Sequence, residues 1–259
     1  MLLALDIGNT NVTCGLFDSG KLIASWRLAT DPNRQSDEYM LQFANLIPMK
    51  GTTIDQISSV AICSVVPSLT AAMQDVSRSL FDTEPLVVGA GTRTGVRILY
   101  DPPRDVGADR IVDAVAAFNR YGGPSIIVDF GTATVFDAVS EDGTYLGGAI
   151  APGLAVAAEA LERRTAQLRQ VELAAPPNAI GRNTIHAMQS GFVFGYVGLV
   201  ESMVNRFKHE LGSEDARVIA TGGQAALIAS QTEIIDFVDQ ELTLYGLQYV
   251  YMLNQGTAL

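Results

Sequence analysis

The chain has 259 residues, of which 48% are hydrophobic and 17% are charged. This composition excludes an intrinsically disordered protein and suffices for one large domain or two modest ones, each with its own core. The net charge is −11, and no basic cluster occurs that would neutralise a run of phosphates, so nucleic acid is not expected as a partner. Two Cys and two His, in no metal-binding spacing, exclude a disulfide framework and a zinc site.

No stretch is typical of a signal peptide or a membrane span. The N-terminal apolar run Leu2–Leu5 is stopped by Asp6 and has no cationic lead-in. The richest later run, Ala149–Ala158, contains Pro152 and Gly153. Together with the sparse cysteines, this predicts a cytoplasmic protein that makes no contact with a membrane.

The chain opens with a buried strand that ends in a carboxylate and a tight polar turn, Leu2–Asn11, and a similar segment, Ile126–Thr134, lies near the midpoint. One offset of 123 residues relates three pairs: Asp6 to Asp129, Gly8 to Gly131 and Gly20 to Gly143. Three coincidences at one offset indicate an internal duplication. The alternative is that any two hydrophobic strands followed by turns look alike.

Each copy continues as a hairpin, with strands at 12–17 and 22–28 in the first and at 135–139 and 145–150 in the second. Ser36 is placed to cap the first helix. Helices are then predicted over 37–48, 68–81, 108–121, 155–170 and 183–211, after Gly222-Gly223 and near 247–253, with strands at 59–64, 86–88 and 217–221. We therefore predict a duplicated α/β fold with domains 1–117 and 118–259 and a ligand between them.

The segment Gly15–Leu22 has the spacing of a phosphate-binding P-loop but does not fit one. Leu22 stands where the Mg²⁺-binding Ser or Thr belongs, and a strand rather than a helix is predicted to follow. We interpret it as a hairpin turn.

The turn after each duplicated strand has the chemistry of a phosphate-binding loop. In both copies a glycine lets the backbone approach an anion, and small polar residues supply donors: Asp6-Ile7-Gly8-Asn9-Thr10-Asn11 and Asp129-Phe130-Gly131-Thr132-Ala133-Thr134. A carboxylate beside each loop requires a cation, and hydrated Mg²⁺ is expected at Asp6. For one copy alone, a simple Asx-turn explains the pattern better; the pair favours a polyphosphate.

Two further segments carry weaker signals. Gly222-Gly223 ends a predicted strand and opens a helix, which would let a flat heterocycle or ribose lie on the backbone, although a plain strand-to-helix turn explains it equally well. Asp109 lies in the first turn of the helix that follows Gly107, beside Arg110. That position favours an ionised carboxylate, which suits a general base or a simple helix-terminus charge.

The chain resembles the type III pantothenate kinases. The resemblance covers residues 1 to about 225 and rests on five motifs in order and spacing: Asp6–Asn11, Gly107–Arg110, Asp129–Thr134, Gly148–Gly153 and Gly181–Thr184. It implies membership in the acetate and sugar kinase, heat-shock chaperone ATPase and actin superfamily, with duplicated actin-like (ribonuclease H-like) domains. It also implies ATP-dependent phosphorylation of the hydroxymethyl group of pantothenate, the first committed step to coenzyme A.

The resemblance further implies a role for individual residues. Asp109 looks like the catalytic base, and Asp129 looks like the ligand of a monovalent cation, K⁺ or NH₄⁺. The ATP-binding residues implied are Asp6, Ile7, Gly8, Asn9, Thr10, Asn11, Val12, Thr13 and Thr132, with Gly222 and Gly223 as the adenosine motif. The pantothenate contacts implied are Tyr100, Gly107, Ala108, Asp109, Arg110 and Thr184, in a pocket completed by a neighbouring subunit.

The sequence departs from the family pattern at two positions. Asp113 stands where relatives commonly carry Asn, one helical turn after Asp109. A like charge there is expected to raise the pKa of one of the two carboxylates unless Arg110 or a cation offsets it. Val135 replaces a hydroxylated residue often seen after the second phosphate loop, which removes one possible donor.

The long helix carries three glycines among large apolar residues: Gly191, Gly195 and Gly198. Small residues at helical spacing let another backbone come close, so we expect a homodimer interface here, with packing inside the subunit as the alternative. Two other functions remain open at this point. One is a non-enzymatic transcription accessory factor on the same fold, and the other is a kinase for another small hydroxylated acid or sugar.

Overall fold

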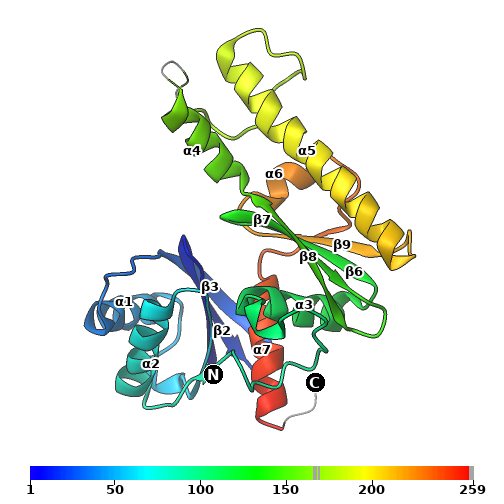
Figure 1. The fold of residues 1–259 in the computed structure, drawn as a ribbon. Helices are drawn as coiled ribbons and strands as arrows, with labels where there is room; N and C mark the ends of the chain where they lie inside the picture. The colour runs from blue at the N-terminus through cyan, green and yellow to red at the C-terminus, as the bar shows by residue number, and fades with distance from the viewer. Residues whose placement is uncertain (166–167, 169, 257–259) are drawn as a thin grey trace. The chain divides into compact units, whose positions relative to one another are not determined.

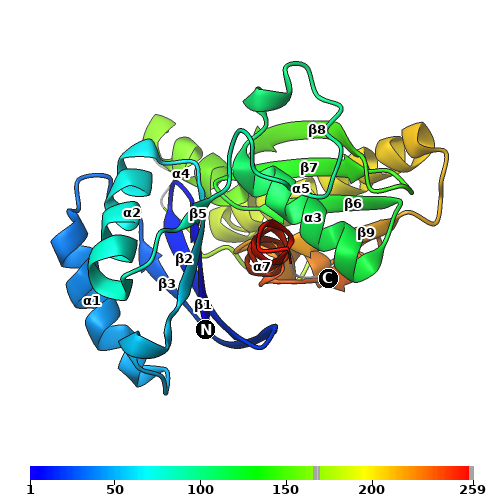
Figure 2. The same cartoon turned by 90° about the horizontal axis from the view of Figure 1, so that it is seen from below.

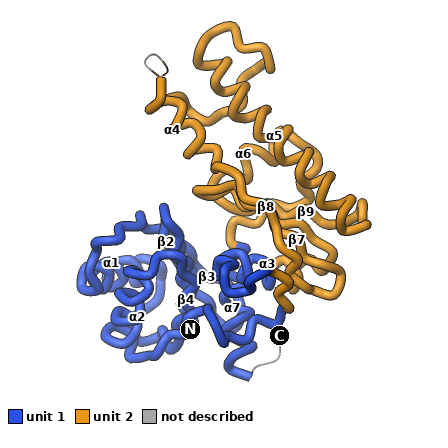
Figure 3. Tube along the Cα trace, viewed as in Figure 1, with its two compact units in different colours: residues 1–96, 101–116, 242–259 blue, residues 97–100, 117–241 orange. Residues whose placement is uncertain are grey.

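The computed structural model describes residues 1–165, 168 and 170–256, which form two compact units (Figure 3). The first unit comprises residues 1–96 and 101–116 and the C-terminal segment from Leu242. The second comprises residues 97–100 and 117–241. Each unit is built on its own five-stranded sheet (Figure 1).

The first sheet has the order β3-β2-β1-β4-β5. Its central strand β1 (Leu2–Ile7) pairs antiparallel with β2 (Asn11–Asp18), which forms a hairpin with β3 (Lys21–Ala29). On the other side, β4 (Ser59–Ser64) and β5 (Leu86–Val87) add in parallel. The segment with P-loop spacing is therefore the β2–β3 hairpin, as predicted.

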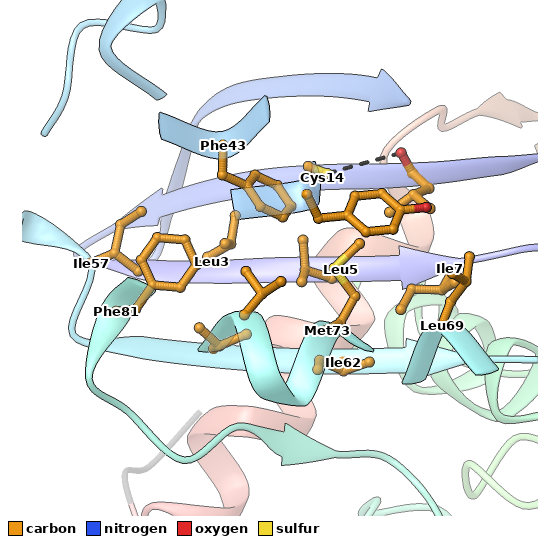
Figure 4. Packing of buried hydrophobic residues seen from close by; sticks show 14 of the residues in the cluster. Leu3, Leu5, Ile7, Cys14, Phe43, Ile57, Ile62, Leu69, Met73 and Phe81 are labelled. Atoms are coloured by element: carbon orange, nitrogen blue, oxygen red, sulfur yellow. Dashed lines mark hydrogen bonds between the residues drawn. The ribbon is translucent and has the colours of Figure 1, made fainter. Parts of the chain in front are cut away.

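Both faces of β1 are buried, which explains its unbroken apolar sequence. Alternate residues point to opposite faces: Leu3, Leu5 and Ile7 pack in the core with residues of α1 (Ser36–Met49) and α2 (Pro67–Phe81) (Figure 4). Figure 2 shows these two helices beside the sheet. Leu2 and Ala4 face the other core, which includes residues of α3 (Ala108–Tyr121) and α7 (Leu242–Asn254). Two short 3₁₀ helices, η1 (Ile54–Gln56) and η2 (Pro103–Asp105), complete the elements of this unit.

The helices α3 and α7 meet backbone to backbone. A Cβ atom at Gly246 of α7 would overlap the carbonyl oxygen of Val112 in α3. Only glycine permits this approach. At its far end α7 is tied to the unit by the Asn254 side chain, whose Nδ2 donates to the Arg93 carbonyl at 2.8 Å.

The second unit repeats the plan of the first. Its sheet has the order β10-β9-β6-β7-β8, with β6 (Ser125–Phe130) at the centre, the hairpin of β7 (Ala133–Val139) and β8 (Tyr145–Pro152) on one side, and parallel β9 (Arg217–Thr221) and β10 (Phe237–Val238) on the other. One core packs this sheet against helices α4 (Leu154–Arg164), α5 (Thr184–Leu211) and α6 (Ala225–Ala229).

The two sheets have the same topology, and β6 lies 123 residues after β1 at both of its ends. The predicted duplicated α/β fold is therefore confirmed. The strand predictions at 59–64 and 217–221 and the helix prediction at 108–121 agree with the observed bounds.

Several predicted details are wrong. The cap of α1 is Gln35 rather than Ser36, because the Gln35 N–H donates to the Glu38 carboxylate at 2.9 Å and the helix starts one residue early. Helix α4 ends at Arg164 instead of extending to 170, and part of that predicted extension (166–167 and 169) lies outside the described residues. The strand β10 was not predicted at all.

The C-terminal helix differs most from the prediction. It begins at Leu242, five residues before the predicted start, and it packs in the first unit rather than in a second domain running to residue 259. Its apolar residues surround the helix, so periodicity marked only part of it. Among the described residues, no helix combines the length and apolar character that a membrane crossing requires.

Candidate active site

The turn predicted to be the first phosphate loop lies between β1 and β2. The Gly8 N–H donates to the Asn11 carbonyl at 2.9 Å and closes the turn, while the Thr30 hydroxyl donates to the Gly8 carbonyl at 2.7 Å. Asn9, Thr10 and Asn11 are exposed. The loop therefore presents short polar side chains on a backbone that is held in place by Thr30, the residue after β3.

The remaining residues assigned to this loop differ in exposure. Asp6 and Thr13 are half-buried and pair across the β1–β2 ladder. Ile7 and Val12 are fully buried in the core, so their side chains cannot contact a nucleotide. Only their backbone groups are available to the predicted ATP site.

The carboxylate of Asp109, at the start of α3, is held in one position by the Arg110 N–H and the close backbone of Gly107; we call this position the seat of Asp109. The Arg110 N–H donates to Asp109 Oδ1 at 2.8 Å, and the carboxylate lies over Gly107 so closely that a Cβ there would overlap Oδ1. Arg110 itself is buried. The glycine of the predicted substrate segment thus makes room for the carboxylate of the predicted base.

Three carboxylates of the first unit act on one buried thiol. Burial raises the pKa of Cys63, and the negative charges of Asp6, Asp109 and Asp113 raise it further. Asp6 lies directly opposite Cys63 in the β1–β4 ladder. Asp6, Asp109 and the buried Asp113 therefore all lie close enough to Cys63 for their charges to act on its thiol.

The same charge reaches the other cysteine. Burial, and then the charge of Asp6, raises the pKa of Cys14 far above that of a free thiol. Both thiols are fully buried. They are therefore uncharged core side chains.

In the second unit, Asp129 lies at the end of β6 among glycines. Its Oδ2 would lie 3.3 Å from a Cβ at Gly131, and its Oδ1 would overlap a Cβ at Gly222. Gly222 also has φ +86°, which disfavours any other residue. These two glycines therefore bring only backbone, and no side chain of their own, close to this carboxylate.

The turn predicted to be the second phosphate loop is held by Gly153, for which no individual role was predicted. The Gly153 N–H donates to the Thr132 carbonyl at 3.1 Å, and a Cβ at Gly153 would overlap the carbonyl oxygens of Gly131 and Thr132. The Gln240 side chain likewise donates to the Gly222 carbonyl at 3.1 Å. Gly153 ends a motif of the family pattern, which is the signal that pointed to it; Gln240 had none.

The predicted substrate residues of the second unit are not gathered in one place. Thr184 is the first residue of α5, and it lies with Arg182 in an open cavity of about 580 Å³ whose other lining residues include Leu161, Met188 and Phe192. The described residues that line this cavity include neither Tyr100 nor Asp129. Tyr100 lies instead beside β8, with its ring 6.4 Å from that of Tyr145.

Among the described residues, no group of three or more His, Cys, Asp or Glu side chains is placed to hold a metal ion. A cation at Asp6 or Asp129 would therefore draw its further ligands from neutral side-chain oxygens, the backbone, the substrate or water. That donor set suits Mg²⁺ at Asp6, because Mg²⁺ usually binds one or two carboxylates and keeps waters and phosphate oxygens.

Solved structures with the same fold are distant in sequence. A "conserved putative Baf family transcriptional activator" from Campylobacter jejuni has a TM-score of 0.63 at 20% identity, covering 98% of this chain and 99% of that one. Component A of the (R)-2-hydroxyglutaryl-CoA dehydratase of Acidaminococcus fermentans has a TM-score of 0.58 at 13% identity, covering 98% of each chain. At these identities the likeness concerns the fold alone.

The sequence comparisons are closer. The family model described as type III pantothenate kinase matches residues 2–206. A type III pantothenate kinase of Roseiflexus sp. (strain RS-1) is 50% identical over 99% of this chain and 100% of its own length, and one of Dehalococcoides mccartyi (strain 195) is 50% identical over 98% of each. On this match along its whole length, the chain belongs to the type III pantothenate kinase family.

Proposed function

We propose that the chain phosphorylates pantothenate with ATP, with Asp109 as the general base. The observation that carries the proposal is the seat of Asp109, whose carboxylate is fixed by the Arg110 N–H and by Gly107 at the start of α3. The identity of the two substrates is inferred from the family to which the chain belongs. An assay of phosphate transfer to pantothenate, with sugars compared as acceptors, tests it; no product, or a preferred sugar, would contradict it.

In this proposal the reaction needs alignment and charge neutralisation more than covalent chemistry. The hydroxymethyl oxygen of pantothenate attacks the γ-phosphorus of ATP, its proton passes to the Asp109 carboxylate, and ADP leaves. The phosphate tail lies on the two loops, with backbone N–H groups and the side chains of Asn9, Thr10, Asn11 and Thr132 as donors. The adenosine lies on Gly222-Gly223.

Two cations complete the proposed site. A hydrated Mg²⁺ at Asp6 would neutralise phosphate charge, as Mg²⁺ does when bound to nucleotides. A monovalent cation, K⁺ or NH₄⁺, would be held by Asp129. The proposal is supported by Gly131 and Gly222, because a Cβ at either position would crowd the Asp129 carboxylate and take space that such an ion would need.

We also propose that the protein is a cytoplasmic homodimer joined through α5. Gly191, Gly195 and Gly198 are exposed, and a Cβ at any of them would touch nothing within 4 Å, so packing inside the subunit does not use them. Large apolar side chains are exposed in the same unit, with Ile180 at 82%, Ile150 at 65% and Ile185 at 56%. A partner over this face would bring a second Thr184 to the pantothenate site.

Removal of the proposed base should slow phosphate transfer without weakening the binding of ATP. We expect Asp109→Asn to lower kcat by about 100-fold or more while ATP affinity stays near normal, because proton acceptance is needed only in the transition state. Steady-state kinetics and ATP titration measure the two effects. Asp75→Asn, the same change on the exposed part of α2, should leave kcat unchanged. Near-wild-type turnover of the Asp109 variant would show that alignment alone drives the step.

A methyl group at Gly107 should displace the carboxylate of Asp109. We expect Gly107→Ala to lower kcat by roughly 10- to 100-fold, since small misplacements of a reacting group have effects of that order. Gly89→Ala is the matched control, because its Cβ would meet nothing within 4 Å. Equal kinetics of the two variants would contradict the proposed seat.

Loss of the Asp129 carboxylate should remove the response to K⁺. We expect Asp129→Ala to abolish activation in a K⁺ titration and to weaken ATP binding. The exposed Glu141→Ala variant should keep both. An unchanged K⁺ response in the Asp129 variant would rule out this carboxylate as the cation ligand.

A charge on the glycine face of α5 should break the dimer. Light scattering at micromolar concentration should show two subunits for the natural chain and one for Gly195→Glu, which should also lose turnover with pantothenate. Leu41→Glu, at a position 67% exposed on α1, should remain dimeric. A natural chain that is monomeric under these conditions would contradict the interface.

A further inference from the structure

A buried carboxylate and a buried tyrosine form a pair in the β7–β8 hairpin that the proposed reaction does not use. The Tyr145 hydroxyl donates to Asp137 Oδ1 at 2.7 Å. Tyr145 is 0% exposed and Asp137 is 2% exposed. Burial of a carboxylate is unfavourable unless it is well hydrogen-bonded, so such a pair calls for an explanation.

The fold itself does not require this pair. At the offset of 123 residues that relates the two copies, Asp137 corresponds to Cys14 and Tyr145 to Leu22. The β2–β3 hairpin of the first unit therefore closes with a buried thiol and an apolar side chain in the same places. The polar pair is a feature of the second unit alone.

Tyr145 holds a short segment that belongs to the second unit although both its neighbours in sequence belong to the first. The Tyr145 N–H donates to the Arg97 carbonyl, and the Leu99 N–H donates to the Tyr145 carbonyl, both at 2.8 Å. Residues 97–100 are accordingly grouped with the second unit. The segment ends in Tyr100.

The side chain of Tyr100 lies against the same elements. Its ring centroid is 6.4 Å from that of Tyr145, with 45° between the planes. A Cβ at Gly147 would lie 3.7 Å from the Tyr100 ring, and Gly147 has φ +126°. The backbone just before Tyr100 is thus bonded to Tyr145, and the Tyr100 ring lies beside β8, where the Tyr145 hydroxyl donates to Asp137.

We propose that Asp137 and Tyr145 are positioning residues that set the place of Tyr100 in the pantothenate site. This inference rests on the proposed function, in which Tyr100 contacts pantothenate. The hydrogen bond from Tyr145 to Asp137 fixes the Tyr145 ring, and the backbone and ring of Tyr145 fix Tyr100. Neither residue of the pair touches the reacting atoms.

The test is the split between pantothenate binding and turnover. Tyr145→Phe keeps the ring and removes only the hydroxyl. We expect the KM for pantothenate to rise about 10-fold, with kcat and the KM for ATP within about twofold of the natural values, because substrate placement rather than chemistry is disturbed. Isothermal titration with pantothenate alone should show the same weakening.

A double variant separates positioning from stability. Asp137→Leu combined with Tyr145→Phe replaces the polar pair with apolar side chains, which resembles the arrangement in the first unit. The melting temperature that Tyr145→Phe alone lowers should return to the natural value in this double variant. The KM for pantothenate should stay raised. Asp137→Asn keeps a side-chain oxygen as acceptor for the Tyr145 hydroxyl, so this variant should keep the KM for pantothenate near the natural value. If Tyr145→Phe alone does not fold, the double variant carries the test.

Coupling to Tyr100 completes the experiment. In a Tyr100→Ala background, Tyr145→Phe should have no further effect on the KM for pantothenate. An unchanged KM in folded Tyr145→Phe, full recovery of the KM in the double variant, or additive effects with Tyr100→Ala would each overturn the inference. A natural chain without activity on pantothenate would instead overturn the proposed function.

Discussion

The site depends on one constraint: each central strand ends in a carboxylate that is only half-buried, at the point where the apolar run gives way to a polar turn. Asp6 and Asp129 are the penultimate residues of strands whose other residues are buried. A charge in such a place must be balanced by hydrogen bonds or cations. At Asp129 the neighbours include Gly131 and Gly222, which bring only backbone close to the carboxylate, and the proposed cations would add to the balance of charge at both carboxylates.

Glycine makes these surroundings possible. Gly107 makes room for the Asp109 carboxylate, and Gly222 does the same for that of Asp129, in both cases where a Cβ would overlap an oxygen. Gly153 brings β8 against the carbonyls of the second loop. Backbone therefore lies directly against the carboxylates of Asp109 and Asp129, and main chain has fewer alternative conformations than a long side chain.

Much of this could be predicted from local sequence. The central strands could be predicted because both of their faces are buried and most of their residues are apolar. The repeat offset of 123 residues predicted the shared topology of the two units. Asp109 and the two loops were readable because each follows its glycine or strand at short range. The resemblance to a family added their roles.

The rest lies in contacts between distant positions. Nothing near Gln240 signals its bond to the Gly222 carbonyl, and the pairing of Asp137 with Tyr145 depends on the register of a hairpin with a bulge. Ile7 and Val12 fall inside a binding motif, yet the pleat turns their side chains into the core. The start of α7 was obscured because helices that are apolar on all sides show no period.

The return of α7 to the first unit has a consequence for synthesis on the ribosome. The inner face of the first sheet, with Ala4, Phe17 and Cys63, is covered in part by Leu244 and Leu247. These residues emerge only after the whole second unit has been translated. This apolar face of the N-terminal half therefore stays exposed while the second unit is synthesised. During that interval the nascent chain presents an apolar surface to which a chaperone could bind.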